Sequence, residues 1–522
     1  MLQKLRELSK NSAIYGLGDV AIQLVSFLLL SVYVQYLSKT DYGVLALLGS
    51  VEAMTKLFFR WGVDGSFMRF WYDCEDERAR QRLSSTIFFF LLAVNGVLLF
   101  LSLAAAPYLS TTLLGAPGYT LALQLVLLNT FAIGFTFIPF HVLRIEKRAK
   151  EFSALAFGRS VSTLIVRVVL VVGLQLGIMG VVIADIVVTA VMLAIMVHWF
   201  APLIRPVFSR RVLREALAFG LPRVPHGFAL QVMSVGDRFV LKFLQTPLEL
   251  IGVYSIGVSF GLIPKIALGA FEYAWAPFYY ATSREPGATK IFSGITTYGI
   301  ATLALMTAGL AAVARDLLSI VTHGQYVDAE SVVAWTAVGV FFYGVYLLTS
   351  IGLNITKHTQ FYPVSTAIGA ATNLGLNFLL IPRYGIIGAA WANGATYALQ
   401  AAIAFAMSQR FYPIRYERGR ITRAVAAAGL GYLAARAVPP MGPVAGCLIR
   451  GATVVATMAV LLWITRFFKA EELRGLNALR LRLRGERPLS APPETTEMAG
   501  EIVVTELPHE AIASPEDERQ PR

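Results

Sequence analysis

The chain has 522 residues, of which 56% are hydrophobic and 15% are charged, and its mean hydropathy is +0.63. A soluble domain normally carries about 25% charged residues, so this composition excludes an ordinary soluble protein and indicates a polytopic membrane protein. A formal net charge of +13 can indicate a nucleic-acid partner, but in a membrane protein the basic residues concentrate in the loops on one side of the membrane. We therefore expect no nucleic-acid partner. Two cysteines, Cys74 and Cys447, provide no disulfide framework.

Hydropathy predicts an all-α protein with about fourteen membrane-spanning helices. The first apolar run, 12–36, follows a polar and basic segment and is too long for the core of a signal peptide, so we expect a retained helix. The predicted spans are 12–36, 42–65, 84–106, 119–141, 153–175, 178–200, 220–244, 250–274, 291–314, 331–354, 360–381, 384–407, 421–438 and 443–467.

The second predicted span carries four charged residues at intervals of four, namely Glu52, Lys56, Arg60 and Asp64. This spacing places all four side chains on one face of a single helix. A lone charge at the centre of a bilayer costs about 3 kcal/mol on insertion scales, so this face should meet a protein-lined or hydrated interior. Two interpretations are open: the charges line a cavity, or they pair with one another and with neighbouring helices.

Further ionisable residues inside the predicted spans include Asp19, Arg167, Asp237, Lys265 and Glu272. Arg167, Asp237 and Lys265 lie deep in their spans. Lys265 follows Pro264, which lacks a backbone donor and can kink the helix where the charge sits. Four asparagines inside the predicted spans are expected to hydrogen-bond between helices, and these are Asn129, Asn373, Asn377 and Asn393.

The chain repeats itself at an offset of 208 residues. LGIMGVVIAD at 176–185 lies over YGIIGAAWAN at 384–393, and Gly43 matches Gly252 at a local offset of 209. Six crossings return a chain to its starting side, so the repeat predicts two parallel six-helix lobes related by an axis along the membrane normal.

The repeat also sets the expected domains. The local offset of 209 superposes Lys56 on Lys265, so two facing helices should present a lysine at the same depth. We expect lobes at 1–207 and 208–415, an additional transmembrane hairpin at 416–468, a basic interfacial helix at 469–484 and a disordered cytoplasmic tail at 485–522.

Loop charges indicate the orientation. Thirty lysines and arginines fall in the termini and loops on one side of the predicted membrane. The opposite loops hold only Lys39, Arg315, Arg383 and Arg436. The positive-inside rule therefore predicts that both termini are cytoplasmic and that the number of spans is even.

Motifs for common enzyme chemistry are missing from the sequence. It has no GxxxxGK[ST] phosphate loop, no cysteine and histidine spacing typical of a metal site, and no GxSxG nucleophile motif. The longest outward loop, about 315–330, is short for the active site of a membrane polymerase or ligase. We therefore expect a protein that is not an enzyme and that needs no cofactor or metal.

Two segments carry a family resemblance. NLGLNFLLIPRYGIIGAAWAN at 373–393 and SKNSAIYGLGDVAIQLVSFLLLSVYVQYLSKTDYGVLAL at 9–47 resemble signatures of bacterial polysaccharide-biosynthesis exporters. These are the O-antigen and exopolysaccharide flippases of the multidrug/oligosaccharidyl-lipid/polysaccharide (MOP) exporter superfamily, and the resemblance covers about 1–410. It implies a MATE-like fold in the bacterial inner membrane and a polyprenyl-diphosphate-linked oligosaccharide as cargo. Membrane lipids and other polysaccharide-assembly membrane proteins are the other implied partners.

The leading hypothesis is a flippase with a cationic cavity between the lobes. The residues expected to bind the diphosphate and sugar are Lys56, Lys265, Arg60 and Arg167. The residues expected to couple an ion or to pair charges are Glu52, Asp19, Asp237, Asp64 and Glu272. A multidrug exporter of the same superfamily, a peptidoglycan-precursor flippase and a glycan polymerase or ligase are the alternatives.

We predict a cytoplasmic C-terminus. A phosphatase reporter that works only on the outer face should be inactive when it is fused after Arg487. A fluorescent reporter that folds only in the cytoplasm should be bright at the same position. Phosphatase activity at Arg487 would overturn this topology.

Overall fold

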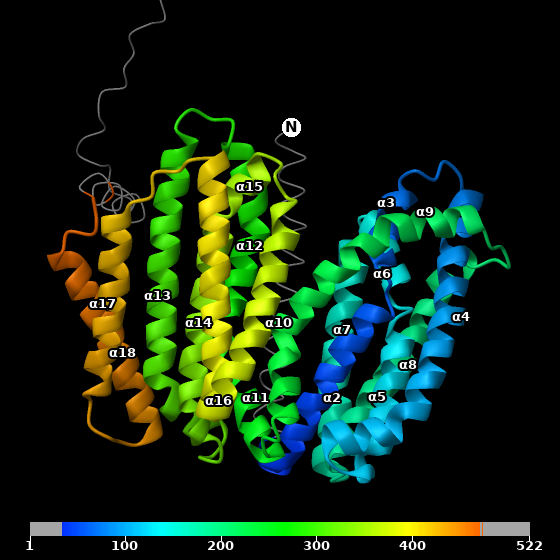
Figure 1. The fold of residues 1–522 in the computed structure, drawn as a ribbon, viewed down its shortest axis with the longest axis horizontal. Helices are drawn as coiled ribbons and strands as arrows, with labels where there is room; N and C mark the ends of the chain where they lie inside the picture. Colours follow the sequence, from blue (N-terminus) through cyan, green and yellow to red (C-terminus); the bar gives the residue numbers. More distant parts are fainter. Residues whose placement is uncertain (1–33, 470–471, 473–522) are drawn as a thin grey trace, which may run out of the picture. The chain divides into compact units, whose positions relative to one another are not determined.

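The computed structural model describes residues 34–469 and 472. Most of the first expected span, including Asp19, lies outside the described residues, as do the expected cytoplasmic tail and nearly all of the expected interfacial helix. Within the described part the regular elements are helices, and no strand occurs there. Figure 1 shows their arrangement.

The first predicted lobe begins with a capped helix. The Ser38 hydroxyl accepts the backbone N–H of Asp41 at 3.1 Å, and the Asp41 carboxylate accepts that of Ser38 at 3.0 Å, which satisfies two donors that the helix end leaves free. The elements in order are α2 (Lys39–Phe58), α3 (Val63–Trp71), α4 (Glu77–Leu109), η1 (Ser110–Leu114), η2 (Pro117–Tyr119), α5 (Thr120–Ile133), α6 (Phe137–Ile145), α7 (Ala149–Val168), η3 (Val169–Gly173), α8 (Gly177–Phe200) and η4 (Ala201–Leu203).

The second predicted lobe, 208–415, starts with a short amphipathic helix, α9 (Arg210–Gly220). Its elements are η5 (Leu221–Arg223), α10 (Val224–Phe243), α11 (Leu248–Gly261), α12 (Ile263–Thr282), α13 (Ala288–Val321), η6 (Val327–Ala329), α14 (Glu330–Thr349), α15 (Ile351–Ile355) and α16 (Phe361–Phe411). Gly385, with φ 56° and ψ −137°, interrupts α16 at the boundary between the expected spans 360–381 and 384–407. Only glycine adopts this backbone conformation readily.

Eight of the described helices are long and apolar enough to cross a membrane, or ten if two bent pairs each form one span. The bent pairs are α2 with α3, at 44°, and α11 with α12, at 41°. The second bend confirms the kink expected beside Lys265, because Pro264 lies in the first turn of α12. The count of fourteen stays a prediction, since the first expected span is largely outside the described residues.

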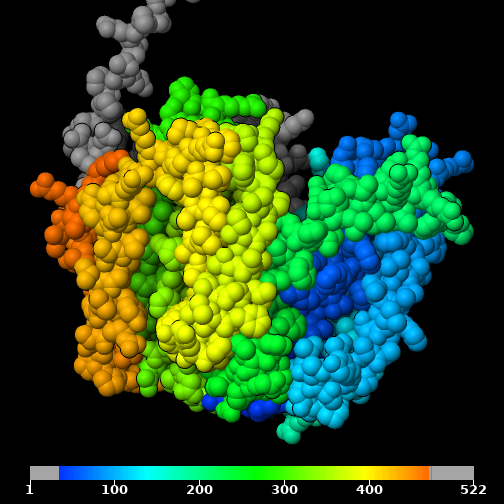
Figure 2. Space-filling model, viewed as in Figure 1, coloured from blue at the N-terminus to red at the C-terminus, as the bar shows by residue number. Residues whose placement is uncertain are grey.

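The expected hairpin packs against the second lobe. It consists of α17 (Arg418–Arg436) and α18 (Pro443–Ile464), and Figure 2 shows it at the surface in orange. Arg450 of α18 donates to the Asp316 carboxylate of α13 at 2.6 Å, and both side chains are largely buried. A Cβ on Gly446 would overlap that carboxylate, so a residue without a side chain allows the pair to form.

The two predicted lobes meet where α2 crosses α11. A Cβ on Gly43 would overlap the carbonyl oxygen of Leu248, and a Cβ on Gly252 would overlap that of Lys39. These glycines match each other in the sequence repeat, as expected for equivalent helices that meet near a pseudo-twofold axis. The two helix backbones therefore come closer than any larger residue would permit.

Charged and aromatic contacts surround this crossing. Lys39 Nζ lies 3.8 Å from a Glu249 carboxylate oxygen and 3.6 Å from one of Asp328. The ring of Tyr42 meets the buried ring of Tyr326 edge-on at 5.7 Å between centroids. Burial raises the pKa of Tyr326, so its hydroxyl stays neutral at this junction.

We predict that Gly43→Leu destabilises the protein by about 2 kcal/mol, because the leucine forces α2 away from α11. Gly49→Leu is the matched control, since a Cβ at Gly49, in the same helix, meets no atom within 4 Å. Thermal unfolding of both variants in detergent measures the difference. Equal stability of the two would contradict the close crossing.

Candidate functional site

A cavity of about 510 Å³ lies within the second predicted lobe. Helices α10, α12, α14, α15 and α16 contribute its walls, and we call it the second-lobe chamber. The lining comprises six aromatic residues, nine other polar or charged residues and five aliphatic residues. The aromatic residues are Trp275, Tyr279, Tyr343, Tyr346, Tyr362 and Tyr397, and the polar or charged residues are His226, Gln231, Ser234, Lys265, Glu272, Ser350, Asn354, Thr366 and Gln400.

Two predicted site residues, Lys265 and Glu272, line the chamber. They are seven residues apart on α12, so they share a face of that helix, about 10 Å apart along its axis. Lys265 Nζ lies 5.4 Å from the centroid of the Tyr343 ring, a cation–π contact with α14. Among residues 34–469 and 472, neither Lys265 nor Glu272 has an ion-pair partner within 4.0 Å. The chamber therefore offers one cation and one anion to a ligand.

The charged residues of the second span lie at the bend between α2 and α3. The expected single helix is wrong here: α2 ends at Phe58, and α3 starts at Val63 after two residues with positive φ, Trp61 and Gly62. Arg60 bridges the break by donating to the Asp64 carboxylate at 2.7 Å. This pair holds α3 against the end of α2.

Lys56 and Glu52 lie on α2 itself, one turn apart, and both are partly buried. Within the described part of the chain, no ion pair within 4.0 Å joins them to each other or to another residue. Lys56 does not line the second-lobe chamber. The expected pairing of Lys56 with Lys265 around one ligand stays a prediction.

Arg167 pairs with Asp185 across α7 and α8. Its Nε donates to one carboxylate oxygen at 2.8 Å and a terminal nitrogen donates to the other at 2.6 Å, the two-pronged geometry that suits a guanidinium. The two side chains are 23% and 25% exposed. A phosphate could use Arg167 only if this pair opened.

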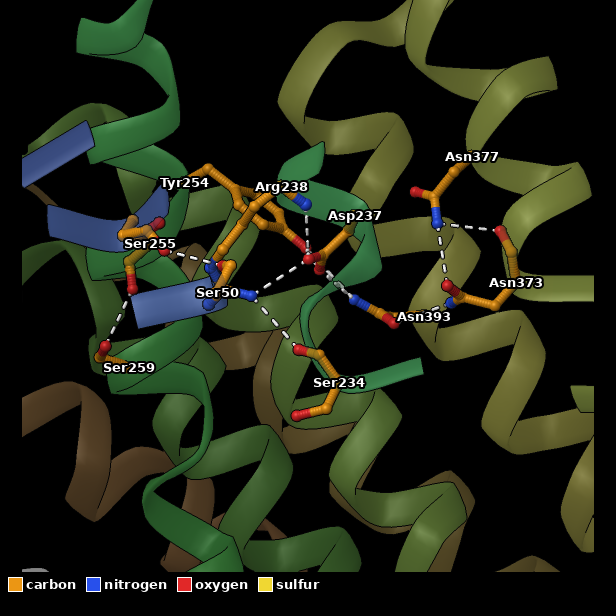
Figure 3. Close-up of polar contacts among 11 residues, drawn as sticks. Ser50, Ser234, Asp237, Arg238, Tyr254, Ser255, Ser259, Asn373, Asn377 and Asn393 are labelled. Carbon is orange, nitrogen blue, oxygen red and sulfur yellow. Dashed lines mark hydrogen bonds and ion pairs between the residues drawn. The ribbon is translucent and has the colours of Figure 1, made fainter. Parts of the chain in front are cut away.

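Asp237 is 1% exposed and joins three helices (Figure 3). The Tyr254 hydroxyl of α11 and the side-chain amide of Asn393 in α16, at 2.9 Å, both donate to its Oδ2. The neighbouring Arg238 donates to its Oδ1 at 3.0 Å. The backbone N–H of Arg238 donates to the same oxygen at 2.8 Å, so four donors from three residues satisfy the buried carboxylate of α10.

The polar network continues along α16. Asn373 donates to the side-chain carbonyl oxygen of Asn393 at 2.9 Å, and Asn377 donates to that of Asn373 at 3.0 Å. The bond between Asn373 and Asn393 confirms hydrogen bonding between helices and fastens the two arms of α16 to each other, whereas Asn377 bonds within its own arm. The buried Oδ1 of Asn129 has no hydrogen-bond partner among the described residues.

The sequence analysis did not predict the tyrosines of the chamber as site residues. Tyr343 and Tyr346 are three residues apart on α14, a spacing that does place them on one face. Their proximity to Tyr362 and Tyr397 depends on how α14 packs against α16, and no local pattern contains that information.

These features define a multi-pass helical membrane protein with a polar chamber inside one bundle. The chain belongs to the family of polysaccharide biosynthesis proteins, whose sequence profile matches residues 34–331. The family and fold expected from the two sequence segments are confirmed. None of the curated proteins compared with the chain matches it in sequence.

Solved structures share the fold. The lipid II flippase MurJ in an inward closed conformation aligns over 90% of this chain and 100% of its own, with a TM-score of 0.69 and 13% identity. An inward-facing multidrug resistance MATE family transporter of the MOP superfamily aligns over 77% and 95%, with a TM-score of 0.59 and 16% identity. A mutant of the Vibrio cholerae MATE transporter VcmN aligns over 78% and 98%, with a TM-score of 0.50 and 15% identity.

We predict that Arg167→Gln lowers the stability by about 2 kcal/mol, because it leaves the Asp185 carboxylate unpaired inside a helix bundle. Arg167→Gln/Asp185→Asn should regain most of that loss, since no isolated charge remains. Arg211→Gln is the control: its partner Glu215 and Arg211 itself are exposed, and such pairs contribute little. A double variant no more stable than the single one in thermal unfolding would argue against the pair.

Proposed function

We propose that this protein is a flippase that moves polyprenyl-diphosphate-linked oligosaccharide units across the bacterial inner membrane for polysaccharide biosynthesis. The observation that carries the proposal is Lys265, a cation placed at the bend between two membrane helices and facing an open chamber. A charge in that position is costly unless it serves a ligand or a pathway. Membership of the polysaccharide biosynthesis family supplies the class of cargo.

The sugar head group would enter a hydrated cavity while the polyprenyl tail stays in the lipid. Lys56 and Lys265 are the cations best placed to hold the diphosphate, because neither is engaged by a carboxylate in the described structure. Arg60 and Arg167 would join only when their bonds to Asp64 and Asp185 loosen. Rocking of the two lobes would then expose the head group on the outer side.

Carboxylates in the spans are the candidates for coupling transport to an ion. Asp237 ties α10 to α11 and α16, so a change in its charge would alter contacts among three helices. Glu52 and Glu272 lack an ion-pair partner among the described residues, whereas Asp64 is held by Arg60. Asp19 is a further candidate for ion coupling, proposed from the sequence because it lies outside the described residues.

A multidrug exporter is the second candidate, because aromatic rings beside Glu272 also suit an organic cation. Lys265 on the same wall disfavours that ligand, since it would repel a cation. A peptidoglycan-precursor flippase is the third candidate, and the fold likeness to the lipid II flippase is the observation that favours it. We propose cytoplasmic termini and a non-enzymatic role for all three.

We predict that Lys265→Gln and Lys56→Gln each abolish export of surface polysaccharide while the protein still inserts into the membrane. Lys→Arg at either position should restore part of the export, since the charge is kept although the planar guanidinium differs from an ammonium group. Lys357→Gln, in an exposed loop, is the control. Surface polysaccharide and membrane-inserted protein are measured in the same cells.

A double variant distinguishes a role of Lys56 in ligand binding from a role in neutralising Glu52. If Lys56 only neutralises Glu52, Lys56→Gln/Glu52→Gln should transport normally, because no uncompensated charge remains. The described structure shows no ion pair between them within 4.0 Å, so we expect the double variant to stay inactive. Normal export by the double variant would rule out a role for Lys56 in binding.

A further inference from the structure

We propose that the second-lobe chamber is a saccharide-binding subsite that takes the sugar nearest the diphosphate. The inference rests on the proposed function and adds to it where the glycan is recognised. It assigns the recognition to a tyrosine wall, defined as Tyr343 and Tyr346 of α14 with Tyr362 and Tyr397 of α16. Lys265 and Glu272 of α12 line the same chamber.

The four rings of the tyrosine wall form one connected array. Tyr343 and Tyr346 lie nearly parallel with centroids 6.1 Å apart, Tyr397 meets Tyr343 edge-on at 5.8 Å, and Tyr362 meets Tyr346 edge-on at 6.3 Å. All four are partly exposed rather than buried, so ring surface remains available in the chamber. The negative face of an aromatic ring attracts the partly positive C–H groups on the flat side of a pyranose.

Contacts of the lining residues themselves hold the chamber in shape. Trp275 is 4% exposed and is stacked between Phe271 and Phe278, with centroids 5.2 and 5.8 Å away. The Tyr362 hydroxyl donates to the backbone carbonyl of Ser350 at 3.2 Å, which fixes one ring of the wall. A wall that is already ordered loses little entropy when a ligand binds.

The polar part of the lining suits sugar hydroxyl groups. Nine lining residues are polar or charged without being aromatic, against five aliphatic ones. Amides such as Gln231, Gln400 and Asn354 can both donate and accept, and the Glu272 carboxylate can accept two hydroxyl hydrogens. A lipophilic cation would leave most of these groups without hydrogen-bond partners inside the chamber, which is costly.

The volume of the chamber and the positions of its lining residues indicate which part of the cargo fits. A volume of about 510 Å³ is typical of a small-molecule site and is too small for a long oligosaccharide. Lys265 Nζ lies 5.4 Å from the Tyr343 centroid, and the Tyr346 centroid lies 6.1 Å from that of Tyr343. A phosphate held by Lys265 would thus bring the first attached sugar to the tyrosine wall, where Tyr346 is a ring not engaged by the lysine.

The test measures the affinity of the detergent-solubilised full-length protein by calorimetry. The probes are farnesyl diphosphate and farnesyl diphosphate carrying one glucose, galactose or N-acetylglucosamine. At least one sugar conjugate should bind about tenfold more tightly than farnesyl diphosphate, which corresponds to about 1.4 kcal/mol. Tyr346→Leu should abolish this preference, and Tyr346→Phe should retain most of it, because phenylalanine keeps the ring. Lys265→Gln should weaken all probes by the same factor.

Other results would overturn the inference. Equal affinity for farnesyl diphosphate and for every conjugate, or equal weakening of all probes by Tyr346→Leu, would remove the sugar subsite while leaving the flippase proposal intact. Glu272-dependent binding of tetraphenylphosphonium in competition with the conjugates would make the chamber a drug site. Tyr432→Leu, outside the chamber on α17, controls for general damage and should leave the sugar preference unchanged. Failure of every diphosphate probe to bind, together with normal export by Lys265→Gln, would instead reject the proposed function.

Discussion

The cost of a charge in hydrocarbon is the constraint on which the described structure depends. Arg167 with Asp185 and Arg450 with Asp316 meet this cost as ion pairs, and Asp237 meets it with four hydrogen-bond donors from three residues. Lys265 and Glu272 meet it differently, because they face a polar chamber. Charges that are satisfied by protein hold helices together, whereas charges that face a chamber are available to a ligand.

Arg167 with Asp185 and the Asp237 network lie within the predicted lobes, and Arg450 with Asp316 joins the hairpin to the second lobe. The junction between the lobes is instead an apolar core to which both lobes contribute. Arg167 and Asp185 tie two helices of the first lobe, and the Asp237 network ties three helices of the second. Between the lobes, the glycine crossing of α2 and α11 depends on shape, and the ion pairs of Lys39 are long and partly exposed. Such a distribution favours lobes that keep their internal structure when the contact between them changes.

The helical class, the family, the equivalence of Gly43 with Gly252 and the kink beside Lys265 were predictable from the sequence. Each has a direct signal there, namely the length of the apolar segments, the family signatures, the internal repeat and Pro264. Sequence reasoning expected one straight helix from 42 to 65 and so did not foresee the bend after Phe58, since apolar composition gives no sign of a backbone break there. It also missed the tyrosine wall. Rings on α14 and α16 come together through the packing of distant helices, and only tertiary structure shows that they share a chamber.

The first lobe has no tyrosine at the positions equivalent to the tyrosine wall. At the offset of 208 that aligns 176–185 with 384–393, the four wall residues fall on Phe135, Ile138, Ala154 and Thr189. Ile138 and Thr189 are 0% and 2% exposed, whereas Phe135 is half-buried and Ala154 is exposed, so two of the four equivalent positions belong to the core of the first lobe. Duplicated bundles begin with the same packing, and a polar chamber lined by large rings removes part of a core that would otherwise stabilise the lobe. A wall of tyrosines in one copy and not in the other is understandable if the chamber binds a ligand, and the proposed mechanism would then assign sugar recognition to the second lobe and a charge, Lys56, to the first.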